Sequence, residues 1–225
     1  MKISTFYCVA VCCMISLTSC LKNSSVDEQP PYVSVINTSP TLGTVNIYVD
    51  GTVLNSGAVP FGGALAYSQV TAGDHTFKFT TASGTESLLT KAVSLSADKI
   101  YSFYLTGKEE QMDGLLVEDD LSVSSTDKAF VRFINLSPDA PALDLSTADG
   151  VMLFSAKAYR ESTAFNAINP ATYTLVIKDA STAVQYAAIN AIAFTAGKYY
   201  TIISRGMLVP GSIDQPFSSQ IIINL

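Results

Sequence analysis

The chain of 225 residues has no tryptophan, a single histidine and only 14% charged residues. The one imidazole, His75, cannot build a zinc site alone, because such sites take three or four protein ligands. It is in phase with Phe77 and Phe79 along an alternating segment, which favours a structural side chain at the end of a strand. A Ser-His-Asp triad would have to use it, and the chain contains no G-x-S-x-G sequence. Gly62-Gly63 lacks the spacing of a phosphate-binding loop. The sequence therefore predicts no enzyme and no cofactor.

Basic residues are also scarce, with 13 Lys and Arg against 19 Asp and Glu and a formal net charge of −6. Nucleic-acid binding needs clustered Lys and Arg that neutralise phosphates. The charge balance therefore argues against nucleic acid as a partner. It argues equally against electrostatic adsorption to an anionic lipid surface.

What is present first is an N-terminal export signal. Lys2 gives it a positive start, residues 6–17 form an apolar run too short for a membrane span, and Leu17-Thr18-Ser19-Cys20 reads as a bacterial lipobox. We predict a lipoprotein signal peptide over residues 1–19 and lipidation of Cys20, whose sulfur would carry the lipid. Acyl chains would then hold the protein on the membrane, at about 0.8 kcal/mol per buried methylene. The alternative is an ordinary secretory signal with an incidental cysteine.

Cleavage before Cys20 would also remove the other three cysteines, so the mature chain would form no internal disulfide. Residues 20–31 are polar and end in Pro30-Pro31, which predicts an acylated cysteine followed by a flexible tether. Leu21, where inner-membrane lipoproteins typically carry an aspartate, favours the outer membrane. Asp27-Glu28 weakly resembles an acidic export signal, so we expect a cell-envelope location with surface exposure.

The chain then repeats itself. Residues 32–40 (YVSVINTSP) match residues 130–138 (FVRFINLSP), residues 75–79 match 173–177 at the same offset of 98, and residues 99–103 match 198–202 with one residue more. Three matched blocks in the same order indicate a tandem duplication of a domain-sized unit. We expect a first repeat at residues 32–117, an acidic and solvated linker at 118–128, and a second repeat at 129–225.

Apolar and polar residues alternate within each unit, as Val45, Ile47 and Val49 do with their neighbours. Turn pairs such as Asp50-Gly51 separate the alternating runs. The pattern predicts an all-β fold of two tandem immunoglobulin-like antiparallel β-sandwich domains. The alanine-rich residues 182–194 could also form a helix. Their counterpart, residues 85–95, looks like two short strands, so we expect strand there.

Residues 137–145, SPDAPALDL, resemble the signature of a bacterial repeat family, domain of unknown function 4397. The second unit keeps this signature, whereas the first has Thr41-Leu42-Gly43 where Asp-Ala-Pro is expected. The resemblance covers both units. It implies an extracytoplasmic β-sandwich, often in tandem and often on lipoproteins, and it brings no catalytic residues. The combination is similar to proteins of the Bacteroidota.

Three acids near the signature, Asp139, Asp144 and Asp149, could supply oxygen ligands for calcium. The alternative is that they hold turns by bonding to the backbone. The first repeat has Thr41 and Asn46 at the positions of Asp139 and Asp144, so at most one unit could carry such a site. A glycosidase would need two of these acids facing each other across a cleft.

Tyr48 and Tyr104 fall in the solvent phase of their strands and could stack on sugars or on partner side chains. Aromatic residues are also simply good strand formers. Together these features favour a membrane-anchored, non-catalytic binding or surface module with a glycan or a surface protein as partner. Two alternatives remain. One is a fimbrial or filament-type subunit that exchanges its C-terminal segment 218–225, and the other is a carbohydrate-binding accessory protein.

Overall fold

The computed structural model describes residues 28–122 and 125–225, whose regular secondary structure is β-strand apart from one short 3-10 turn, η1 (Glu109–Gln111). The signal peptide, Cys20 and most of the tether lie outside these residues and stay predictions. The strands of the first repeat are β1 (Tyr32–Asn37), β2 (Thr44–Val49), β3 (Thr52–Val53), β4 (Val59–Pro60), β5 (Ala64–Gln69), β6 (Gly73–Thr81), β7 (Ser87–Leu95), β8 (Ile100–Thr106) and β9 (Asp113–Glu118). Those of the second are β10 (Ala129–Asn135), β11 (Leu143–Thr147), β12 (Met152–Lys157), β13 (Asn166–Ile168), β14 (Ala171–Asp179), β15 (Gln185–Phe194), β16 (Tyr199–Arg205) and β17 (Ser218–Asn224).

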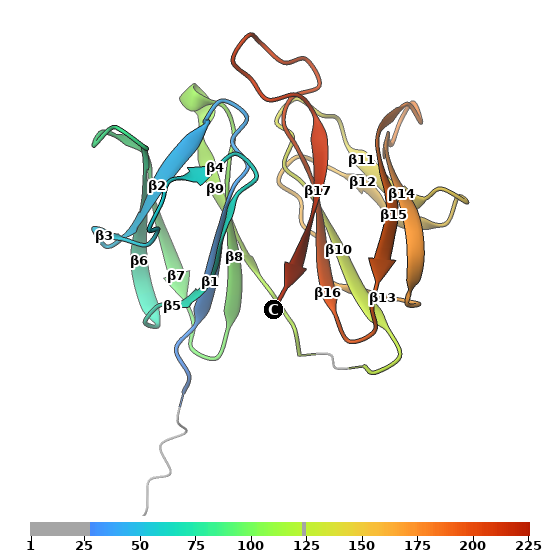
Figure 1. Cartoon of the computed structure of the whole chain (residues 1–225), viewed down its shortest axis with the longest axis horizontal. Coiled ribbons are helices and arrows are strands. Elements are labelled where there is room, and N and C mark those ends of the chain that lie inside the picture. The colour runs from blue at the N-terminus through green and yellow to red at the C-terminus, as the bar shows by residue number, and fades with distance from the viewer. Residues whose placement is uncertain (1–27, 123–124) are drawn as a thin grey trace, which may run out of the picture.

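Each repeat forms two sheets, and the strand order is the same in both (Figure 1). The first repeat has sheets β5-β1-β8-β9 and β3-β2-β6-β7, with β4 also paired to β2. The second has sheets β13-β10-β16-β17 and β12-β11-β14-β15. In the first repeat the rings of Phe77 and Phe79 stack on Phe103 of the other sheet, with centroids 5.0 and 5.4 Å apart. The expected all-β fold of two tandem sandwiches is confirmed.

One strand pairing in each repeat is parallel, which the sequence did not predict. β1 runs parallel to β8, with Val35 opposite Phe103, and β10 runs parallel to β16, with Phe133 opposite Ile202. Parallel neighbours need a long crossover connection. Here the crossover contains the strands of the other sheet, so the first and last matched blocks of each repeat meet at its centre.

The alanine-rich segment is a strand, as predicted, because β15 spans most of it. The expectation of two short strands over residues 85–95 is wrong, since β7 is one continuous strand. Lys91 in the middle of β7 is only partly buried, and its Nζ lies 2.6 Å from Asp113 Oδ1. The ladder with β6 continues on both sides of Lys91, from Ser87 opposite Thr80 to Leu95 opposite Gly73.

The two repeats pack against each other through the sheets that contain β1 and β10, which face one another at the centre of Figure 1. The contact has its own hydrophobic cluster, made of Ile36, Tyr104, Ile134, Leu136 and Ile203. These sheets are therefore covered on both faces, unlike antiparallel sheets that leave one face in water. That is why every residue of β10 is buried.

Two sequence predictions fail at this interface. Tyr104, expected on the solvent side of its strand, is fully buried between the repeats and is not an exposed binding residue. Asp119, expected in a solvated linker, is only 2% exposed and forms an ion pair with Arg132 of the second repeat. The solvated part of the linker therefore begins after Asp119, with the exposed Asp120.

The C-terminal segment completes its own repeat. β17 pairs with β16 along its full length, from Ser218 opposite Arg205 to Asn224 opposite Tyr199. This is the simpler of the two expectations for residues 218–225. A strand exchanged with a neighbouring molecule would first have to leave this ladder.

Candidate functional site

The serine of the Ser-Pro pair that ends the first matched block of each repeat has a structural role. The Ser39 hydroxyl donates to the Gly107 carbonyl at 2.7 Å, and the Ser137 hydroxyl donates to the Gly206 carbonyl at 2.8 Å. Both glycines have positive φ, 87° and 79°, which an L side chain rarely adopts. These residues therefore hold the turn that follows the central parallel strand of each repeat.

Asp139, the first calcium candidate, is committed to the backbone. Its Oδ1 and Oδ2 accept hydrogen bonds from the N–H groups of Leu208 and Val209, both at 2.8 Å. These bonds tie down the loop of residues 206–217, which stands out at the top of Figure 1. The first repeat has a shorter loop at this place, residues 107–112, and Thr41 in the aligned position. The signature aspartate thus serves the longer loop.

The other two calcium candidates lie elsewhere. Asp144 accepts from the N–H of Ala156 at 2.8 Å, and Asp149 accepts from the Thr147 hydroxyl. Across residues 28–122 and 125–225, no three His, Cys, Asp or Glu side chains are grouped so that they could hold a metal ion. The structure therefore does not bring the three acids together as a calcium site.

Tyr48, the remaining aromatic candidate, lies half-buried on the outer sheet of the first repeat. Lys78 of the neighbouring strand places its ammonium group 5.1 Å from the centre of the Tyr48 ring. This cation–π contact occupies part of the surface on which a ligand could stack.

The two repeats differ at one end of each sandwich, where His75 and Tyr173 occupy aligned positions. His75 Nε2 donates to the Thr71 carbonyl at 2.7 Å, and the Tyr173 hydroxyl donates to the Asn169 carbonyl at 3.0 Å. Thr71 and Asn169 are themselves aligned. Different side chains therefore fill the same structural place in the two repeats.

In the first repeat this end is closed by a second contact. His75 Nδ1 lies 2.7 Å from Asp50 Oδ2, and the other carboxylate oxygen accepts from the Thr76 N–H at 2.8 Å. The Thr76 and His75 hydrogen bonds lower the pKa of Asp50. Asp50 and Gly51 have φ of 50° and 82°, as in a two-residue hairpin turn, and this turn sets the carboxylate against the imidazole. His75 is only 7% exposed as a result.

In the second repeat the same end is open. Ala148 stands where the first repeat has Asp50. The backbone N–H of Ala148 donates to the Thr174 carbonyl, as the backbone N–H of Asp50 donates to the Thr76 carbonyl. A groove of about 470 Å³ lies there. Its polar lining residues are Lys128, Thr147, Asp149, Asn169 and Tyr173. Its apolar lining residues are Val151, Leu153, Ala167 and Ile168.

The polar groups of this groove keep hydrogen-bonding capacity. Lys128 Nζ donates to Asn169 Oδ1 at 2.7 Å, a bond that uses one of three ammonium protons and leaves the amide NH₂ outside it. The Thr147 hydroxyl donates to Asp149 Oδ1, and the second carboxylate oxygen takes no part in that bond. An apolar floor with a few convergent polar groups is the usual composition of a small-ligand site.

Sequence reasoning singles out only one residue of this groove, Asp149, and assigns it to calcium. Tyr173 enters only as the counterpart of His75, while Lys128 and Asn169 are missed. The available signal was the repeat alignment, which sets Ala148 opposite Asp50. That substitution removes the carboxylate that closes the first repeat.

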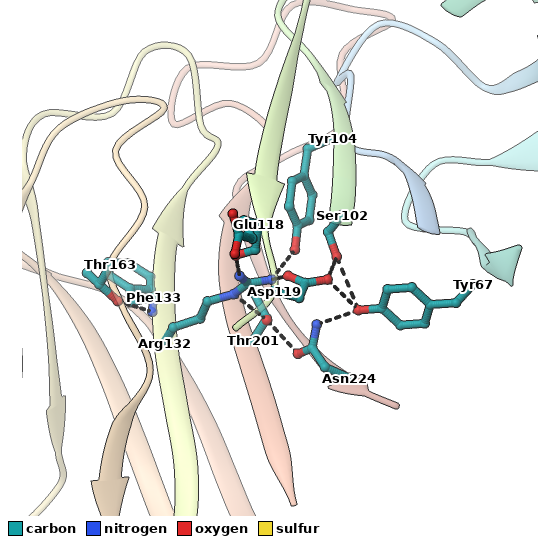
Figure 2. A network of polar contacts seen from close by, with 10 residues as sticks. All are labelled: Tyr67, Ser102, Tyr104, Glu118, Asp119, Arg132, Phe133, Thr163, Thr201 and Asn224. Atoms are coloured by element: carbon teal, nitrogen blue, oxygen red, sulfur yellow. Dashed lines mark hydrogen bonds and ion pairs between the residues drawn. The ribbon is translucent and has the colours of Figure 1, made fainter. Parts of the chain in front are cut away.

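A second polar cluster lies between the repeats, around Arg132 (Figure 2). The Arg132 guanidinium donates to Asp119 and to the Thr201 hydroxyl, and the Tyr67 hydroxyl donates to Asp119 Oδ2 at 2.6 Å. Asn224 Nδ2 in turn donates to the Tyr67 oxygen at 2.8 Å. Burial, together with the Asp119 charge, raises the pKa of Tyr67. These groups satisfy one another inside the interface, so the cluster joins the repeats.

The model of a protein family described as Domain of unknown function (DUF4397) matches residues 31–146, from the start of β1 into β11. None of the curated proteins matches the chain. A solved carbohydrate-binding module, CBMbc (family CBM26) from Eubacterium rectale Amy13K in complex with maltoheptaose, is 10% identical over 85% of this chain and 96% of that chain, with a TM-score of 0.28. A candidate cell adhesion protein from Bacteroides fragilis is 11% identical over 88% of this chain and 97% of that chain, with a TM-score of 0.21.

Proposed function

This chain belongs to the DUF4397 family, and on that premise we propose that it is a lipid-anchored, non-catalytic binding module of the bacterial cell envelope. The observation that carries the proposal is the groove of about 470 Å³, which is open in the second repeat where His75 and Asp50 close the first. A duplicated fold that closes this end in one repeat and leaves it open in the other has room for a ligand at this end of the second repeat only.

The described side chains favour binding without chemistry. A catalytic acid or base must be free to reach a substrate proton. Both ring nitrogens of His75 are instead hydrogen-bonded within its own repeat. Asp139 holds a loop backbone, and the charges of Asp119 and Arg132 are paired out of solvent. This arrangement supports the proposal of a module that binds and releases its ligand unchanged.

Anchoring is proposed from the lipobox and the lipid-accepting Cys20. The N-terminal segment joins the first repeat through Gln29 and Asp98, whose backbone and side-chain groups exchange two hydrogen bonds of 2.9 and 2.8 Å. That junction lies at the end of the molecule opposite the loop of residues 206–217 (Figure 1). An outer-membrane anchor would thus hold the loop end away from the bilayer. In residues 28–122 and 125–225, no helix has the length and apolar character needed to cross a membrane.

Metabolic labelling tests the anchor. Cells that express the full chain are fed an alkyne fatty acid, and labelling of the wild type is compared with that of Cys20→Ala. We expect the label to disappear in this variant and to persist in Cys13→Ala, the matched cysteine control within the signal. Equal labelling of wild type and Cys20→Ala would show that the protein is not a lipoprotein.

A groove-filling variant tests the binding role. Val151 is 56% exposed at the groove, so Val151→Trp adds bulk there without entering the core. The immobilised full chain and this variant are exposed to the polysaccharide and the protein fractions of the cell envelope. We expect one fraction to be retained by the wild type and lost from the variant. Equal retention of both fractions by the two proteins would show that the groove takes no part in binding.

A further inference from the structure

The charges that line the groove of the second repeat select against charged ligands. Lys128 and Asp149 are its two charged lining residues, and their formal charges cancel. A ligand with a net charge would therefore meet one attractive and one repulsive charge in the lining. A fully apolar ligand would cover the ammonium and the carboxylate without replacing their bonds to water, which is costly. A neutral ligand that carries both donors and acceptors satisfies both groups.

The polar groups suit a ligand that carries several hydroxyls. A hydroxyl both donates and accepts, so one can donate to the Asp149 carboxylate while another accepts from Lys128 Nζ or from the Asn169 amide. Lys128 and Asn169 are already linked at 2.7 Å, so the two donors are presented together. A sugar ring offers several such hydroxyls, whereas a single peptide amide offers one donor and one acceptor that point in opposite directions.

The remaining wall suits the carbon face of such a ring. Tyr173 is fixed on both sides, through its hydroxyl bond to Asn169 and through its packing on Phe194 with ring centroids 5.9 Å apart. Val151, Leu153 and Ile168 supply the apolar surface beside it. A rigid aromatic wall binds at low entropic cost, because little side-chain freedom is lost. The volume of about 470 Å³ lies within the range of small-ligand pockets.

We propose that the groove lined by Asp149, Lys128, Asn169 and Tyr173 binds an uncharged sugar ring of a glycan through its hydroxyls. This inference rests on the proposed function, since it names the ligand class of the same groove. The first repeat does not share the property, because His75 and Asp50 bond each other at the aligned place.

The test titrates the purified full chain by calorimetry with a panel of probes. The panel holds neutral trisaccharides of glucose, mannose and xylose, the acidic sialyllactose, and a capped Ala-Val-Ala peptide. Two variants change the groove: Val151→Trp fills it, and Asp149→Asn removes the charged acceptor while keeping an oxygen for Thr147. Two matched controls lie outside it: Val209→Trp, on the 80% exposed loop position, and Asp144→Asn, which bonds Ala156.

We expect at least one neutral trisaccharide to bind the wild type. Its affinity should fall at least tenfold in Val151→Trp and in Asp149→Asn, and should be unchanged in both controls. If no sugar binds at millimolar concentration, or if both groove variants bind as the wild type does, the proposal is wrong. Preference for sialyllactose would also overturn it, because the charge argument would then fail. Binding of the peptide alone, lost in Val151→Trp, would overturn the sugar assignment while leaving the proposed binding function intact.

Discussion

Arg132 of the second repeat and Asp119 at the end of the first form an ion pair whose side chains are 1% and 0% exposed. The positions aligned with them in the opposite repeats hold Ser34 and Asn224, which carry no charge. Each charged residue of this pair therefore has an uncharged counterpart in the other repeat. The contact between the repeats departs from exact repetition at this pair.

The repeated arrangement is visible in the bonds around this pair. Ser102 donates to Asp119 at 2.7 Å, and the aligned Thr201 donates to Asn224 at 2.7 Å. The two repeats thus face each other in an approximately two-fold manner, as in isologous dimers. A first repeat packed on a second copy of itself would set Ser34 near Asp119 and leave the carboxylate unpaired. The ion pair therefore favours the pairing of unlike repeats.

Removal of Arg132 should destabilise the whole chain. Arg132→Met leaves Asp119 charged, buried and without its cation, which typically costs about 3–5 kcal/mol of unfolding free energy. Lys99→Met is the matched control, since its pair with Glu118 is nearly half exposed and its removal should cost far less than removal of the buried pair. Urea unfolding followed by circular dichroism measures both. A loss for Arg132→Met no larger than the control would contradict the buried-pair account.

Asp50 should make the stability of the first repeat depend on acid pH. Its pKa in the folded state lies below the ordinary value of 3.8, because the Thr76 N–H and His75 bond the carboxylate. A lowered pKa gives stability that is present above the ordinary pKa and lost as the pH falls through the folded-state value. The difference in unfolding free energy between wild type and Asp50→Asn should thus shrink as the pH falls below about 4.

Unfolding of these two proteins between pH 3 and 5 gives the measurement, with the exposed Asp74→Asn on β6, the strand of His75 and Thr76, as control. A wild-type advantage that grows as the pH falls would show that the sign is wrong.

The alternation of the sequence predicts the strands and the repeat but not the contact between the repeats. Tyr104 illustrates the reason, since a period of two assigns one face to the core and the other to water. Packing of one repeat on the other buries that second face. A sign of this was present in β10, where Phe133 and Ile134 are both apolar although they point to opposite faces. Adjacent apolar residues in a strand indicate a sheet that is covered twice.

The groove escaped prediction for a different reason. The position aligned with Asp50 holds Ala148 in the second repeat, and an alanine carries no motif. The polar residues of the groove come from separate segments, with Lys128 before β10 and Asn169 before β14. Only the comparison of the repeats in space, position by position, brings these residues together.

Gly206 should tolerate no side chain. Its φ of 79° costs an L residue about 1–2 kcal/mol, and a Cβ built there would lie 2.1 Å from the Pro216 carbonyl oxygen. Gly206→Ala should therefore lose more stability than Gly150→Ala, where φ is 96° and no atom lies within 4 Å of the built Cβ. Thermal unfolding of the two variants isolates the steric part. Equal losses would mean that the Pro216 backbone moves aside freely.

Asp139 should control the loop of residues 206–217 without controlling the fold. Asp139→Ala removes the acceptor of two backbone N–H groups, those of Leu208 and Val209. The core clusters contain none of its contacts, so we expect a loss of unfolding free energy of only about 1–3 kcal/mol. Hydrogen exchange should quicken at Leu208 and Val209, since a loop that loses its ties opens locally. Asp144→Asn, whose side chain bonds the Ala156 N–H and not the loop, should leave these two amides unchanged. If exchange at both amides is unaltered in Asp139→Ala, the signature aspartate does not hold the loop, and its place in the second repeat needs another cause.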